Sequence, residues 1–150
     1  MIQFHLAQLN IANAKASMDS PVMEGFVARL DEIHELADQS KGFVWRWESG
    51  SIDSSVVDVF GDPQLLVNLT LWESIHDLKH FVYKTVHVEL IQGRDAWFDK
   101  MPEMHQVLWW VPVGHIPSVA EAKQKLEMLR ADGPTAEAFS IAQPFPMPPR

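Results

Sequence analysis

Hydrophobic and polar residues alternate along four stretches of the chain, and this spacing of two is typical of β-strands. The predicted strands are residues 2–11, 43–48, 65–72 and 105–111. Alternation in the second strand collects three large aromatic residues on one face: Phe43, Trp45 and Trp47. A shorter run at 55–60 could add a strand to the loop that precedes the third strand.

Spacings of three and four residues predict helices between and after these strands. Each predicted helix starts at a recognisable capping signal: Ser20 before Pro21, Ser74 with Asp77, and Ser118 with Glu121. The first helix is expected to end near Gly42 and the last at Gly133. The middle one is expected to continue in two shorter pieces, 85–93 and 94–100, and a final short strand is expected at 138–142.

The order strand, helix, strand, strand, helix, strand predicts an α+β domain of the ferredoxin-like, split βαβ type, an antiparallel sheet with helices on one face. The other face would carry large apolar residues from this set: Phe4, Leu6, Trp45, Trp47, Leu69 and Trp109. Such an exposed apolar face predicts that two sheets pair in a C2 homodimer. The domain is expected to span 1–143, with 144–150 as a proline-rich tail that is extended or disordered.

The composition of the chain limits the partners it can have. With a net charge of −8 and no run of Lys or Arg, it lacks the basic patch that nucleic acid or an anionic membrane surface attracts. Cysteine is absent, which excludes disulfides, thiolate metal sites and a cysteine nucleophile. The chain has no basic leader and no apolar run of about 20 residues. We therefore expect a cytoplasmic protein without nucleic-acid or membrane partners.

Residues 66–98 concentrate side chains that can bind a flat, apolar ligand. Aromatic rings are combined there with a phenol, an imidazole and a guanidinium: Trp72, Phe81, Tyr83, His87, Arg94 and Trp97. His87 could be a ligand or a general base, or a hydrogen-bonded helix residue. Tyr83 could orient a substrate oxygen or pack into the core. Arg94 could clamp an anion or form weak surface pairs with nearby carboxylates.

Motifs for the common cofactor and hydrolase sites are missing. The chain has no G-x-G-x-x-G, P-loop, G-x-S-x-G or H-E-x-x-H motif, so nucleotide binding, phosphoryl transfer and triad hydrolysis lack support. His76 and His80 stand four residues apart, as in a helical zinc site, but no third ligand accompanies them. We expect no metal site of this kind.

Five segments carry a resemblance to a known family: LAQLNIA at 6–12, GFVWR at 42–46, LWES at 71–74, HFVY at 80–83 followed by His87, and LWWVPVGHIP at 108–117. Over its whole length the chain resembles the bacterial domain-of-unknown-function family 3291. This resemblance implies a place among the dimeric α+β barrels, which include antibiotic-biosynthesis monooxygenases, haem-degrading oxygenases and several haem enzymes. It implies no particular activity, because none is agreed for the family.

The stretch containing LWES, FVY, His87, Arg94 and Trp97 is also similar to spheroidene monooxygenase, a haem-dependent carotenoid oxygenase. This second resemblance implies His87 as an axial haem ligand and Arg94 as the partner of a propionate or a substrate carboxylate. The haem-degrading relatives use an asparagine on the first strand, a tryptophan and a helix histidine. The resemblance implies Asn10, Trp72 and His87 as their loose counterparts here.

These interpretations predict a monooxygenase-like protein with an apolar, aromatic-lined pocket for a flat aromatic or polyene ligand, and haem as a candidate cofactor. The alternative is a non-catalytic small-molecule-binding module of the same fold. The predicted catalytic residues are Tyr83, His87 and Arg94, and the last two are also the predicted cofactor contacts. The predicted substrate contacts are Asn10, Asn68, Trp72, Phe81, Trp97, Trp45 and Trp109.

Overall fold

The structure is a computed structural model of the 150-residue chain. It describes residues 4–14, 20–25, 28, 35–47, 65–81, 98–99 and 105–148. Among these residues, no helix has the length and apolar character needed to cross a membrane.

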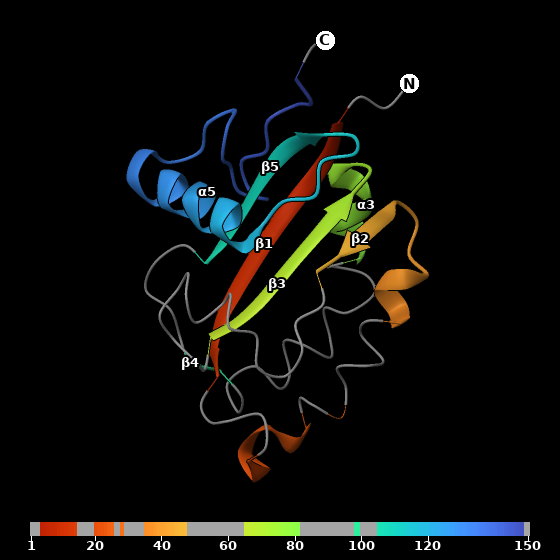
Figure 1. The fold of residues 1–150 in the computed structure, drawn as a ribbon, viewed down its shortest axis with the longest axis vertical. Helices are drawn as coiled ribbons and strands as arrows, with labels where there is room; N and C mark the ends of the chain where they lie inside the picture. Colours follow the sequence, from red (N-terminus) through yellow and green to blue (C-terminus); the bar gives the residue numbers. More distant parts are fainter. Residues whose placement is uncertain are drawn as a thin grey trace.

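An antiparallel sheet forms the centre of the described fold (Figure 1). Its strands are β1 (Phe4–Ala14), β2 (Phe43–Arg46), β3 (Leu65–Trp72), β4 (Phe98–Asp99) and β5 (Gln106–Pro112). β3 and β5 flank β1, β2 pairs with the outer side of β3, and the short β4 pairs with the end of β1. This order is that of the split βαβ unit, so the predicted ferredoxin-like α+β class is confirmed.

The register of the strands decides which side chains share a face of the sheet. Leu6 lies opposite Trp72 of β3, and the next residue, Ala7, lies opposite Trp109 of β5. Successive strand residues point to opposite faces, so these two pairs mark the two sides of the sheet. We name them the Leu6 face and the Ala7 face after these β1 residues.

The Ala7 face packs against helix α5 (Val119–Asp132), which lies over β5 in Figure 1. The buried residues of this core are Ala7, Leu9, Ile11, Val67, Leu69, Leu71, Val107, Trp109, Val111, Ala122, Leu126, Leu129 and Ala138. The hydroxyl of Ser118 accepts a 3.1 Å hydrogen bond from the backbone N–H of Glu121 and caps the helix start. The C-cap is Gly133, with a φ of 74°. Both predicted ends of the helix are confirmed.

The Leu6 face packs against helix α3 (Ile75–His80) and the helical residues 35–38. The buried residues of this second core are Leu6, Ala37, Trp72, Leu78, Phe81, Leu108 and Phe139. The hydroxyl of Ser74 accepts a 3.1 Å hydrogen bond from the backbone N–H of Asp77 and donates to its carboxylate at 2.9 Å. The helix start predicted at Ser74 is therefore confirmed, with the Asp77 carboxylate bonded to the Ser74 hydroxyl rather than to its backbone N–H.

The first predicted helix begins as the 3-10 turn η1 (Pro21–Met23) directly after Ser20, and residues 24, 25 and 35–38 are helical. The chain leaves it through Gly42, whose φ of 84° is in the region that favours glycine. A Cβ at this position would also overlap the carboxylate of Asp77. Gly42 therefore allows both the turn and the close approach of α3.

A β-bulge in β2 overturns the prediction that Phe43, Trp45 and Trp47 share one face of the sheet. Phe43 pairs with Trp72 on the Leu6 face, whereas Trp45 pairs with Leu71 on the Ala7 face. The register shifts between Phe43 and Trp45, and a shift of one residue reverses the side to which the following side chains point. Trp47 accordingly packs, like Trp45, against the core of the Ala7 face.

The predicted open face also needs correction. The apolar residues assigned to the open face lie on both faces of the sheet. Leu6 is on one side, and Leu69 and Trp109 are on the other. The Ala7 face, moreover, is covered at β5 by α5. The helical elements of the split βαβ unit that the structure describes, 35–38 and α3, do share one face, the Leu6 face.

Two further elements differ from the sequence prediction. Residues 98–99, predicted as the end of a helix, form β4, because their backbone pairs with the end of β1. Residues 138–142 form only isolated bridges, including one from Phe139 to Leu108 at the outer edge of β5. The predicted strand at 55–60 and helix at 85–93 lie outside the described residues.

Candidate functional site

Polar side chains occupy the middle of the Leu6 face. Gln8 on the central strand β1 and Thr70 on β3 are paired across the strands, and each is only 5% exposed. Arg46 of β2 pairs with Thr70 on its other side, and the next cross-strand row places Asn10 between Asn68 and Gln106. We call this set the polar band: Gln8, Asn10, Arg46, Asn68, Thr70 and Gln106.

The β-bulge determines that Arg46 belongs to this band. Without the extra residue, regular pairing from Phe43 and Trp72 onward would place Trp45 opposite Thr70. With it, Arg46 takes that position, so the residue opposite Thr70 is an arginine instead of a tryptophan. The bulge thus converts this end of the row from apolar to polar.

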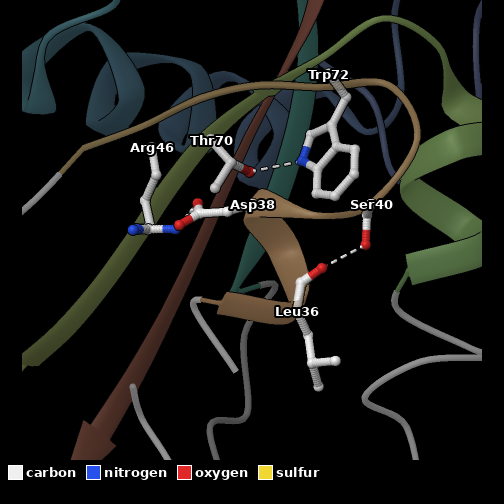
Figure 2. Close-up of polar contacts among 6 residues, drawn as sticks. All are labelled: Leu36, Asp38, Ser40, Arg46, Thr70 and Trp72. Atoms are coloured by element: carbon white, nitrogen blue, oxygen red, sulfur yellow. Dashed lines mark hydrogen bonds and ion pairs between the residues drawn. The ribbon is translucent and has the colours of Figure 1, made fainter. Parts of the chain in front are cut away.

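A hydrogen-bond relay connects the band to the aromatic part of the same face. The indole Nε1 of Trp72 donates to the hydroxyl oxygen of Thr70 at 2.9 Å, as Figure 2 shows. The Thr70 hydroxyl in turn donates to Oε1 of Gln8 at 2.8 Å. Among the described residues, Nε2 of Gln8 has no hydrogen-bond partner. The relay therefore uses the acceptor of this carboxamide and leaves its donor group available.

Aromatic rings hold Trp72 in place at the start of the relay. Phe43 contacts it edge-on with ring centroids 5.4 Å apart, and Phe81 lies against it at 5.2 Å. Trp72 is itself only 1% exposed. Rings packed in this way fix the direction of the indole N–H, which is what a relay needs.

The charge of Arg46 is balanced within the protein. Its Nη1 lies 2.7 Å from Oδ1 of Asp38, and the side chains of Arg46 and Asp38 are 13% and 52% exposed (Figure 2). The guanidinium also lies over the ring of Phe43, 5.9 Å from the centroid. The band therefore presents neutral amides and a hydroxyl, together with a cation that already has a carboxylate partner.

Accessibility increases from one row of the band to the next. Thr70 and Gln8 are buried, Asn10 and Gln106 are half-buried, and Asn68 is exposed. Neighbouring strands are about 4.8 Å apart and alternate residues on one strand about 7 Å apart, so the amides form a small grid. The Asn68 row is therefore the accessible end of this grid, and the rings around Trp72 lie at its buried end.

The structure brings together four of the residues predicted to contact substrate. Asn10, Asn68 and Trp72 share the Leu6 face, and Phe81 packs against Trp72. Two others, Trp45 and Trp109, lie on the Ala7 face and do not join them. The remaining predicted site residues lie outside the described part of the chain: Tyr83, His87, Arg94 and Trp97.

Sequence reasoning missed Gln8, Thr70 and Arg46 as site residues. A signal existed for the first two, because Gln8 is two residues from Asn10 and Thr70 lies between Asn68 and Trp72 at the same spacing. No sequence signal located the bulge that adds Arg46. Within the described residues, no group of three His, Cys, Asp or Glu side chains could hold a metal ion.

A second polar cluster lies at the start of α5. The indole Nε1 of Trp109 donates to Oε2 of Glu121 at 3.0 Å, and Oε1 of Glu121 lies 2.7 Å from Nε2 of His115. His115 is exposed, whereas Trp109 is 1% exposed. This cluster ties the connection after β5 to the helix and to the core beneath it.

Fold and site together define a ferredoxin-like α+β domain with a polar band inside one face of its sheet. A family model, the domain of unknown function DUF3291, matches residues 5–150, and the chain belongs to that family. No curated protein matches the chain at a significant level. The family membership expected from the sequence segments is thus confirmed.

Solved structures also resemble this chain at low sequence identity. A protein of unknown function from Nitrosomonas europaea is 10% identical with a TM-score of 0.47, covering 79% of this chain and 97% of its own. PA3566 of Pseudomonas aeruginosa is 9% identical with a TM-score of 0.49, covering 78% of this chain and 99% of its own. A Nitrosomonas europaea protein provisionally named an antibiotic biosynthesis monooxygenase is 13% identical with a TM-score of 0.46, covering 77% and 93%.

Proposed function

We propose that this protein binds a flat, largely apolar small molecule on the Leu6 face, with the aromatic rings around Trp72 against its apolar part and the polar band against its polar atoms. The observation that carries the proposal is the polar band itself. Burying an amide or a hydroxyl inside a sheet costs free energy unless it has a partner, so stability alone does not favour such positions. A ligand with matching polar atoms would supply partners.

The Ala7 face of the same strands provides a comparison for the polar band. At the neighbouring central positions, the Ala7 face carries aliphatic residues throughout β1 and β3: Ala7, Leu9, Ile11, Val67, Leu69 and Leu71. At their central positions the strands are therefore fully able to present an apolar core. Polar residues in the central rows of the Leu6 face, but not in those of the Ala7 face, are what a binding surface requires and a structural layer does not.

We propose a binding role first and oxygenation as its extension. Neither the amides, the hydroxyl nor the guanidinium of the polar band can act as a general base near neutral pH. Oxygen chemistry would depend on the residues proposed from the sequence, with His87 as ligand or base, Tyr83 orienting a substrate oxygen and Arg94 holding an anionic group. This monooxygenase-like role is supported by the resemblance to oxygenases of the dimeric α+β barrels.

Haem finds no support among the described residues of the polar band. A haem site needs an axial ligand and cations for two propionates, and the band offers no imidazole, while its guanidinium is paired with Asp38. The proposed haem contacts, His87 and Arg94, belong to the part of the chain that is not described. We derive no chemical step through haem and include hemin only as a probe.

We also propose that the protein is a homodimer, paired at the part of the Ala7 face beside β2. What supports this is that Trp45 and Trp47 are only half-buried there, while α5 covers the other side of the face. Light scattering at micromolar concentration should give twice the 17.1 kDa chain mass. Trp45→Glu should give a monomer or aggregates, and a monomeric wild type would refute the dimer. A cytoplasmic location remains a prediction from the sequence.

Binding is tested by titrating the full chain with neutral flat aromatics, a polyene and hemin, and following heat by calorimetry. We expect saturable binding of at least one flat aromatic compound. Asn10→Leu should weaken that binding about tenfold. Asn13→Leu should leave it unchanged, because Asn13 is on the same strand, half-buried, and odd-numbered positions of β1 face the other way. Equal effects of both variants, or no saturable binding, would refute the proposal.

A further inference from the structure

Gln8 combines deep burial with an incomplete set of hydrogen bonds. It lies on the central strand and is 5% exposed, with its Oε1 occupied by the hydroxyl of Thr70. Among the described residues, no group accepts a hydrogen bond from its Nε2. The described part of the polar band therefore leaves this donor group available to an acceptor from outside the band.

The relay from Trp72 includes the carboxamide of Gln8 in one orientation. An indole N–H can only donate, so the Thr70 oxygen 2.9 Å away must accept. The Thr70 hydroxyl proton is then free to be donated to Gln8 at 2.8 Å, and only a carbonyl oxygen can accept it. The side-chain amide of Gln8 accordingly lies with its oxygen toward Thr70 and its nitrogen on the other side, an arrangement that uses the proton of the Thr70 hydroxyl.

The rest of the polar band indicates the charge of the ligand atom that Gln8 meets. Its neighbours in the band are amides and a hydroxyl, and the nearby guanidinium of Arg46 already has Asp38 at 2.7 Å. The protein carries a net charge of −8. An anionic ligand group would gain no unbalanced cation here, whereas an uncharged acceptor oxygen would complete the hydrogen bonding of a neutral amide.

We propose that Gln8 is the specificity-determining residue of this site, donating from Nε2 to an uncharged carbonyl oxygen on a flat apolar ligand. Trp72 and Thr70 are positioning residues that act through Gln8. The proposal rests on the proposed binding function and adds the ligand class, namely flat compounds with a neutral carbonyl at one edge. Compounds of the same shape without that oxygen leave the amide donor without a partner and bind less tightly.

The test uses 9-fluorenone and fluorene, which have nearly the same flat shape and differ in the carbonyl oxygen. Calorimetric titration of the wild-type chain should give a dissociation constant about tenfold lower for fluorenone. Gln8→Met keeps the length and apolar stem of the side chain, and should bring the two constants to within about twofold without weakening fluorene. Asn13→Leu is the matched control, because Asn13 is a half-buried amide of the same strand that faces away from the polar band, and it should keep the preference.

A second readout separates a hydrogen bond from a change of shape. The infrared carbonyl stretch of bound fluorenone should lie at lower frequency in the wild type than in Gln8→Met, because a donated hydrogen bond weakens the carbonyl bond. Should Gln8→Met fail to fold, Thr70→Val serves instead, since it keeps Gln8 and removes the hydroxyl that orients it. This variant should lower the preference for fluorenone by several-fold.

The outcomes distinguish the two proposals. Equal binding of fluorenone and fluorene to the wild type, or an unshifted carbonyl stretch, would overturn the role of Gln8 while leaving the binding function in place. Retention of the full preference in both Gln8→Met and Thr70→Val would do the same. Failure of both probes and of every other flat aromatic compound to bind would overturn the proposed function and this inference together.

Discussion

The two faces of the sheet are built from the same strands, yet they use their buried tryptophans differently. Trp72 on the Leu6 face and Trp109 on the Ala7 face are each 1% exposed, and each donates its indole N–H to another side chain. Trp109 donates to Glu121, a residue of the first turn of α5. Trp72 donates to Thr70 and, through it, positions the carboxamide of Gln8.

The difference lies in where each chain of hydrogen bonds ends. On the Ala7 face it ends within the protein, because Glu121 also accepts at its second oxygen from His115 and is capped through its backbone by Ser118. On the Leu6 face it ends at an amide nitrogen for which the described residues offer no acceptor. A network that is satisfied internally stabilises the fold, whereas one with a remaining donor is suited to an external acceptor.

The largest expected effect on stability follows from removing the Trp109 side chain from the core of the Ala7 face. Trp109→Ala should lower the free energy of unfolding by about 3–5 kcal/mol, because it leaves a cavity in the core and deprives Glu121 of a donor. Urea denaturation followed by circular dichroism measures the loss. Ligand binding, extrapolated to the folded fraction, should keep its preference for fluorenone, because the change lies on the other face. A loss below about 1 kcal/mol would show that Trp109 does not organise this core.

An intermediate effect is expected from the matched variants Trp72→Phe and Trp109→Phe, which keep a ring and remove the N–H. Trp109→Phe should cost about 1.5–3 kcal/mol, because a hydrogen bond to a carboxylate is lost, and Trp72→Phe about 1 kcal/mol, because its acceptor is neutral. Only Trp72→Phe should reduce the fluorenone preference. If both variants changed ligand preference equally, the functional contrast between the two faces would be wrong.

Sequence patterns predicted most of the strands and helix starts of this fold, but not which residues share each face of the sheet. The third predicted strand has the same bounds as β3, and the Ser74 and Ser118 helix starts are where the capping signals put them. The helix starts depend on hydrogen bonds between residues three apart, and the strand is marked by the hydrophobic pattern of its own residues, so both can be predicted from short stretches of sequence. Asn10 entered the predicted site through the resemblance to haem-degrading oxygenases rather than through a local pattern, and its contact with a ligand stays a prediction.

What could not be predicted depends on pairing between distant segments. The bulge that moves Trp45 to the Ala7 face, and Arg46 to the Leu6 face, exists only because β2 pairs with β3. Which face α5 covers is likewise decided by packing, since its buried positions could fit either side of a sheet. Gln8 and Thr70 look like ordinary solvent-facing strand residues until the register places them opposite each other in the interior.

The smallest expected effect on stability concerns the charged end of the polar band. Asp38 is 52% exposed, so its pair with Arg46 is largely solvated, and Asp38→Asn should change the free energy of unfolding by less than about 1 kcal/mol. Its effect on ligand choice should be clearer, because the variant removes the carboxylate that balances Arg46. Binding of fluorenone-4-carboxylate should strengthen several-fold in low salt, and this gain should shrink at high salt, while binding of uncharged fluorenone stays constant. Equal changes for both probes would mean that Asp38 shapes the site sterically, and would remove the argument that the wild-type band selects an uncharged ligand.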